Sequence, residues 1–193
     1  WREHFSGADA ARSLVGADAT EARVRSASTS ADVLHFATHS IGTGTDCALA
    51  ATRGFALVTD QPADANAASM LASTALALAG SRDAAQSEDD GLLGAEEIAT
   101  LDLSRVHWAV LAACATAAGA TRHYEGLFGL SRAFRLAGAR TVIMSLWPVD
   151  DAATAQWTEA LYAARLSRGL DSAAAMQTAQ RDVLAARRRS GES

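Results

Sequence analysis

Three short apolar runs constrain the fold of this chain most strongly, because each has the length and composition of a buried β-strand. They occupy residues 33–39, 106–114 and 141–146. Segments of helical character separate them, with apolar residues such as Leu130 and Phe134 at helical spacing. Strands joined through helices need crossover connections, which give a parallel sheet with helices against its faces. The sequence therefore predicts an α/β fold, a three-layer α/β/α sandwich with a mainly parallel central sheet.

Turn and capping residues place the remaining elements. Asp18 or Thr20 can cap a short helix that ends near Ser28, Gly138 is suited to end a helix, and Asp150 can cap the next one. The predicted helices span residues 3–15, 20–28, 95–101, 125–137, 150–164 and 171–188, and further strands are predicted at 55–59 and 73–79. Residues 81–90 form a polar, acidic stretch of the kind that stays disordered and is easily cleaved.

Length and charge narrow the class of protein. The 193 residues suit a single domain over residues 1–193, and the start at Trp1 instead of Met suggests a part of a longer chain. The sequence has no Lys and a net charge of −5, which argues against a general nucleic-acid-binding surface. No leader pattern occurs, and no apolar run approaches the roughly 18 residues that a membrane span needs. We therefore expect a cytoplasmic protein that binds neither nucleic acid nor membrane.

The two cysteines, Cys47 and Cys114, are too few for a disulfide framework, and no CxxC pair occurs. Neither a GxGxxG loop nor a Walker loop is present, so the common nucleotide-binding motifs lack their phosphate cradle. We expect no metal and no organic cofactor.

His39 and Cys114 supply the strongest indication of chemistry. Each closes one of the apolar runs, so each is expected to emerge where a strand ends and a loop begins. In open α/β sheets the sites lie at these strand ends. A thiol with an imidazole beside it can act as a nucleophile and its base. The pair therefore suggests a Cys-His hydrolase.

Several motifs in order give the chain a family resemblance, which is strong from about residue 32 to residue 151. They are His35-Phe36-Ala37-Thr38-His39, Gly91-Leu92-Leu93 with Ala95-Glu96-Glu97-Ile98, Leu111-Ala112-Ala113-Cys114, Glu125-Gly126-Leu127-Phe128-Gly129-Leu130 with Arg132-Ala133-Phe134, Gly138-Ala139, and Ser145-Leu146-Trp147-Pro148-Val149-Asp150-Asp151. With these motifs the chain resembles the CHAT family of caspase-like and separase-like cysteine peptidases.

The resemblance implies a caspase-like fold and a catalytic dyad. Cys114 would attack the scissile carbonyl, and His39 would protonate the leaving amine. The backbone N–H groups of Ser40 and Cys114 would stabilise the oxyanion, which is worth about 3 kcal/mol per donor in comparable hydrolases. The implied function is that of a cysteine endopeptidase that cleaves a polypeptide partner. Family members are commonly regulated by a helical-repeat domain or an activator protein, so the resemblance implies a regulated peptidase of bacterial signalling or defence. The Arg-rich, Lys-free composition fits a GC-rich bacterial genome.

The resemblance also suggests where specificity resides. Asp150 and Asp151 match a stretch that in separases supplies acidic residues to a pocket for a basic side chain, and a carboxylate suits a bidentate Arg partner. The alternative is structural, because both positions also fit a helix cap and first turn. His35 is expected to be a structural hydrogen-bonding residue on the opposite face from Phe36. Cys47 carries no motif.

Two other classes of function remain open. Ser40 stands where the family usually has Gly, and this favours a catalytically weak scaffold or interaction module, because Ser at positive φ would be strained. A small-molecule hydrolase could use the same dyad in a closed pocket. A covalent probe directed at cysteine separates an enzyme from a scaffold, since only the enzyme predicts labelling that depends on both Cys114 and His39.

Overall fold

The computed structural model describes residues 11–42, 74–80, 89–112, 114–115, 120–145 and 150–191. The chain divides into two compact units, one of residues 14–148 and one of residues 1–13 with 149–193. The single domain expected over residues 1–193 stays a prediction.

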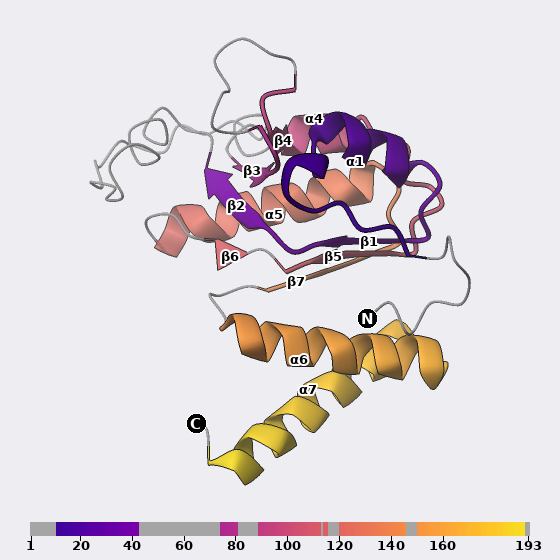
Figure 1. Ribbon diagram of the computed structural model, residues 1–193, viewed down its shortest axis with the longest axis vertical. Helices are drawn as coiled ribbons and strands as arrows, with labels where there is room; N and C mark the ends of the chain where they lie inside the picture. The colour runs from indigo at the N-terminus through magenta and orange to yellow at the C-terminus, as the bar shows by residue number, and fades with distance from the viewer. Residues whose placement is uncertain are drawn as a thin grey trace. The chain divides into compact units, whose positions relative to one another are not determined.

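The larger unit holds every described strand (Figure 1). The strands are β1 (Val33–Phe36), β2 (His39–Gly42), β3 (Thr74–Ala77), β4 (Leu92–Gly94), β5 (Trp108–Leu111), β6 (Cys114–Ala115) and β7 (Thr141–Met144). Its helices are the short 3-10 helix η2 (Gly16–Asp18), α1 (Glu21–Ser28), α4 (Ala95–Ala99) and α5 (Ala120–Leu136).

These strands form two sheets. The first has the order β1-β5-β7 and is parallel throughout. The second has the order β4-β3-β2-β6, in which β2 is parallel to β6 but antiparallel to β3, and β3 is antiparallel to β4. The prediction of one mainly parallel sheet is therefore correct for the first sheet and wrong for the second.

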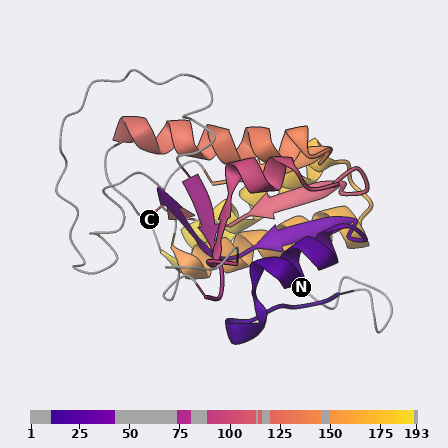
Figure 2. The same ribbon diagram turned by 90° about the horizontal axis from the view of Figure 1, so that it is seen from above.

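One face of the first sheet is buried under helices. Figure 1 shows α1, α4 and α5 on the same side of β1, β5 and β7, and in the view from above α4 lies between α5 and α1 (Figure 2). In the core beneath them, the rings of Phe36 and Phe134 lie 5.6 Å apart and tilted, a favourable geometry for two aromatic side chains. The buried side chains of this core also include Leu76, Leu93, Ile98, Leu103, Ala109 and Leu130.

The turn after α5 needs its glycine. Gly138 has φ +107°, and a Cβ there would lie 3.0 Å from the backbone nitrogen of Ser104. The helix therefore ends at the residue predicted to end it, because only glycine takes this conformation without strain and leaves room for Ser104.

The described part of the smaller unit is helical. It contains α6 (Asp151–Tyr162), a π-helical continuation η3 (Ala163–Ser167) and α7 (Ser172–Ser190), and α6 packs against α7. Asp150 caps α6 through Ala153 N at 2.9 Å, and Asp171 caps α7 through Ala174 N at 2.8 Å. Both helices thus begin where an Asp side chain satisfies a free backbone N–H.

The expected α/β class is confirmed, and the third layer of the predicted sandwich stays a prediction because α6 and α7 belong to the other unit. The predicted helix over 3–15 does not extend through residues 11–15, which have no regular structure. The remainder of that helix, the strand at 55–59 and most of the acidic stretch at 81–90 lie outside the described residues. Thr20 is the cap of α1, accepting from Arg23 N at 3.4 Å.

Candidate active site

Both runs that carry the predicted dyad break before the functional residue. β1 ends at Phe36 and β2 begins at His39, while β5 ends at Leu111 and β6 begins at Cys114. The expectation that His39 and Cys114 close their strands is therefore wrong, since each opens a short strand of the second sheet. Apolar composition predicts extended backbone, but it does not mark the point at which a strand leaves one sheet for another.

The two breaks are matched. Phe36 pairs with Leu111 in the first sheet, and His39 pairs with Cys114 in the second, with the same offset of 75 residues. The last bond before the break is that from Ala112 N to the oxygen of Phe36, at 2.9 Å. The two chain segments therefore step from one parallel ladder to the next together, without a change of register.

This register brings His39 and Cys114 together. They are direct partners on neighbouring parallel strands, and such strands lie about 4.8 Å apart. The His39 side chain is exposed, as a group that meets a substrate has to be. For Cys114 the structure describes the strand position and not the side chain. The two residues singled out from the sequence are thus cross-strand neighbours in the second sheet.

Ser40 does not strain the backbone. It lies inside β2, between β3 on one side and β6 on the other, and is only 3% exposed. Strand backbone is extended, a conformation that any residue adopts. The replacement of Gly by Ser therefore costs no unfavourable φ at this position. The oxyanion role of the Ser40 and Cys114 backbone N–H groups stays a prediction.

Besides the bond from Ala112 N to Phe36, a side-chain hydrogen bond that sequence reasoning missed restrains the break before His39. The hydroxyl of Thr38 donates a hydrogen bond to the backbone oxygen of Ala77, the last residue of β3. Thr38 lies in the segment His35-Phe36-Ala37-Thr38-His39, in which His39 is the residue with the evident chemistry. A threonine between two strand segments gives no sign in the sequence of which distant carbonyl it will meet.

A buried carboxylate holds the start of β4. Glu21, on α1, is 1% exposed and accepts a hydrogen bond from Gly91 N at 2.6 Å. Burial raises the pKa of Glu21, as do the nearby charges of Glu97 and Asp90, while the bonds from Gly91 and Arg25 act in the opposite direction. Sequence reasoning missed Glu21, because an acidic residue in the first turn of a helix is also expected on dipole grounds alone.

Glu97 completes this network. It accepts a bond from Gly94 N at 2.7 Å and forms an ion pair with Arg25, which also lies 3.3 Å from Glu21. The family-like segment that contains Gly91 and Glu97 is thus tied to α1 by charge and by backbone hydrogen bonds. A pocket of about 580 Å³ beside this network is lined by Glu21, Ala22, Arg25, Asp89 and Glu97.

The hydrogen-bonding role expected of His35 stays a prediction. His35 is half-buried on β1, beside Phe36, which belongs to the core. Burial lowers the pKa of His35, which favours the neutral imidazole.

Asp150 and Asp151 serve α6 in this structure. Asp150 is the helix cap, and its backbone oxygen also accepts from the Thr154 hydroxyl at 2.9 Å, while Asp151 lies exposed in the first turn. Asp150 thus takes the cap position and Asp151 the first-turn position that were expected of a helix start. Because they belong to the smaller unit, their predicted role in substrate binding stays a prediction.

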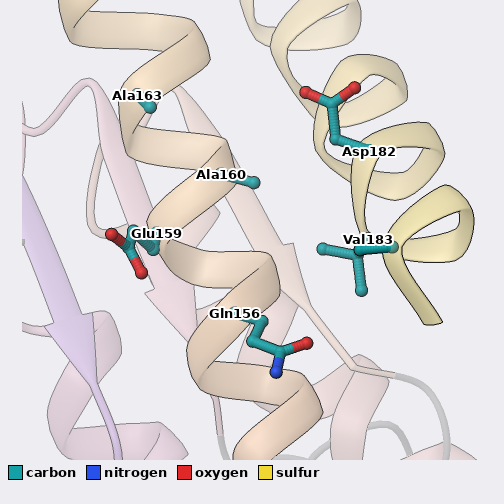
Figure 3. A pocket seen from close by; sticks show the side chains of 7 residues that line it. Gln156, Glu159, Ala160, Ala163, Asp182 and Val183 are labelled. Atoms are coloured by element: carbon teal, nitrogen blue, oxygen red, sulfur yellow. The ribbon is translucent and has the colours of Figure 1, made fainter. Parts of the chain in front are cut away.

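The smaller unit has a pocket of its own between α6 and α7, of about 360 Å³ (Figure 3). It is lined by Gln156, Glu159, Ala160, Ala163, Asp182, Val183 and Ala186. Its lining includes neither His39 nor Cys114. Among the described residues, no group of three or more His, Cys, Asp and Glu side chains is arranged to hold a metal ion. The described helices include none with the length and hydropathy to cross a membrane.

Comparison with known proteins agrees with the motifs. A family model described as CHAT domain matches residues 3–192, so the chain belongs to the CHAT domain family. It is 33% identical over 184 residues to human tetratricopeptide repeat protein 28 and equally so to the mouse protein of that name. The match covers 88% of this chain but only 7% of each relative. Both relatives are mammalian, so the bacterial setting expected from composition stays a prediction.

Proposed function

We propose that this CHAT domain is a cysteine endopeptidase with Cys114 as nucleophile and His39 as general acid/base. The observation that carries the proposal is the direct pairing of His39 with Cys114 across β2 and β6. Membership of a family related to cysteine peptidases supports the same chemistry.

The reaction follows from this pair. The Cys114 thiol gives its proton to His39, and the sulfur attacks the carbonyl carbon of the scissile peptide bond. Backbone N–H groups of Ser40 and Cys114 would donate to the oxygen that becomes negative. As the C–N bond breaks, His39 returns the proton to the departing amine and leaves a thioester on Cys114. Water then attacks the carbonyl carbon of the thioester while His39 takes one of its protons, and the C–S bond breaks to give a carboxylic acid. His39 passes that proton to the departing sulfur, which restores the Cys114 thiol and the neutral imidazole.

Substrate choice and control belong to the same proposal. Asp150 and Asp151 are proposed to favour a basic side chain beside the scissile bond, because a carboxylate pairs well with a guanidinium. The names of the two relatives describe tetratricopeptide repeat proteins. A helical-repeat segment or partner is therefore proposed to regulate the peptidase.

A scaffold without turnover is the second candidate. The names of the relatives mention repeats and no reaction, which favours a module that serves assembly. Ser40 gives this candidate no support through backbone strain, because an extended strand accepts serine without strain.

A peptide library separates the two candidates. The wild type is expected to cleave a subset of peptides, whereas Cys114→Ala and His39→Ala are expected to lower kcat/KM by 1,000-fold or more, roughly as removal of a nucleophile or base does in other hydrolases. Cys47→Ala and His107→Ala are the matched controls and are expected to retain activity. Cleavage that survives Cys114→Ala contradicts the peptidase proposal, and no cleavage by any variant favours the scaffold.

A further inference from the structure

The parallel strand pairing that brings His39 opposite Cys114 is interrupted immediately before these two residues. Between Phe36 and His39 on one chain segment, and between Leu111 and Cys114 on the other, strand pairing stops and then resumes in the second sheet. His39 is the first residue after the gap. Its position therefore depends on how the residues of the gap are held.

A side-chain hydrogen bond of Thr38 restrains this gap from the side of β3. Its half-buried side chain donates through the hydroxyl to the backbone oxygen of Ala77. This bond links the residue immediately before His39 to the end of β3, which is the antiparallel neighbour of β2. The Thr38 bond therefore adds a restraint between Phe36 and His39, where the segment passes from the first sheet to the second.

The acceptor of this bond is firmly placed. Ala77 pairs with Leu92 of β4, and Leu78 N donates to the oxygen of Gly91 at 2.7 Å just beyond. The nitrogen of Gly91 is in turn held by the buried Glu21 carboxylate at 2.6 Å. Because β3 is held by its pairing with β4, and β4 by the buried Glu21 carboxylate, the Ala77 oxygen has a fixed position. It can therefore fix the position of Thr38.

We infer that Thr38 is a positioning residue for His39, acting through its hydroxyl bond to Ala77 to keep the imidazole opposite Cys114. The inference rests on the proposed function and deepens it. His39 is exposed, so the protein locates the ring mainly through its backbone. A displacement of about 1 Å in such a pair can reduce a rate by as much as 100-fold.

Alkylation of Cys114 by iodoacetamide tests this without knowledge of the substrate. The rate is followed against pH by mass spectrometry of the Cys114 peptide in folded protein. A thiol without help from an imidazole has a pKa near 8.5 and is only a few per cent thiolate at neutral pH. We expect Thr38→Val to slow alkylation at pH 7 by roughly tenfold, towards the rate of His39→Ala. Thr38→Ser keeps the hydroxyl and is expected to restore the wild-type profile.

Thr100→Val is the matched control. The Thr100 hydroxyl also donates to a backbone oxygen, that of Glu97 at 2.7 Å, but at the end of α4. Its loss is expected to leave the alkylation profile unchanged. Should Thr38→Val fail to fold, Thr38→Ala replaces it, and Thr38→Ser must then exceed Thr38→Ala in rate.

The outcomes distinguish a failure of the His39–Cys114 dyad from a failure of the positioning role of Thr38. If His39→Ala differs from the wild type but Thr38→Val does not, the dyad stands and the role of Thr38 is wrong. Equal slowing by the Val and Ser variants also overturns it, because packing and not the hydroxyl would be responsible. If His39→Ala has the wild-type profile, the dyad is wrong and the positioning role falls with it.

Discussion

At the scale of single residues, Glu21 shows how a carboxylate can be buried for a structural purpose. Its side chain is almost fully covered, yet it accepts from Gly91 N and lies next to Arg25. A buried carboxylate without such partners would be costly. Here it fixes the start of β4, and through β3 it supports the segment that carries His39.

The raised pKa of Glu21 gives a stability that depends on pH. In the unfolded chain the group titrates near its ordinary value of 4.5, whereas burial makes the folded protein hold the proton to higher pH. The contribution of this group is therefore fully present below pH 4.5 and is lost as the pH rises through the folded pKa. We predict that the free energy of unfolding of the wild type, relative to Glu21→Gln, falls as the pH rises from about 4 through 7.

Urea unfolding of the two proteins at a series of pH values measures this difference. Glu96→Gln, which changes an exposed carboxylate on α4, is the control for general charge effects. A difference between wild type and Glu21→Gln that stays constant or grows with pH would show that burial does not dominate at Glu21.

At the scale of elements, the turn after α5 sets the spacing between that helix and β7. Gly138 combines a positive φ with close approach to the backbone of Ser104. Gly138→Ala is predicted to lower the free energy of unfolding by about 2–3 kcal/mol, because strain and contact add. Gly16→Ala is a useful comparison, since Gly16 has φ +58° but no other atom within 4 Å of the place that a Cβ would take.

Chemical denaturation of both variants measures the two costs. Gly16→Ala is expected to lose only about 1 kcal/mol, the cost of the left-handed conformation itself. Equal losses in the two variants would show that the contact with Ser104 contributes nothing.

Sequence reasoning found the elements better than their pairing. Thr20, Gly138 and Asp150 mark helix ends correctly, because capping and positive φ are local properties. The breaks before His39 and Cys114 were not foreseeable, since the flanking residues are all compatible with extended backbone. The bonds of Thr38 and Glu21 join residues about 40 and 70 positions apart, and a pattern along the chain does not encode such partners.

At the scale of the whole molecule, the parallel ladder joins residues that are 75 positions apart. The candidate site is a consequence of topology, because one register pairs β1 with β5 and also β2 with β6. The family match spans residues 3–192, and the chain covers 7% of the length of its two relatives.

The most direct measurement is a cross-link between the two candidate catalytic positions. In a Cys47→Ala background, His39→Cys places a second thiol in register with Cys114, and parallel neighbours lie within the Cα separation of roughly 4.4–6.8 Å that a disulfide spans. Mild oxidation is predicted to join residues 39 and 114, as seen by mass spectrometry of peptides. His107 immediately precedes β5, where its backbone N–H donates to the oxygen of Asp32 at 2.7 Å, so His107→Cys in the same background is predicted to form no bond to Cys114. Failure of His39→Cys to cross-link while both thiols remain reactive, or equal cross-linking from position 107, would contradict the account.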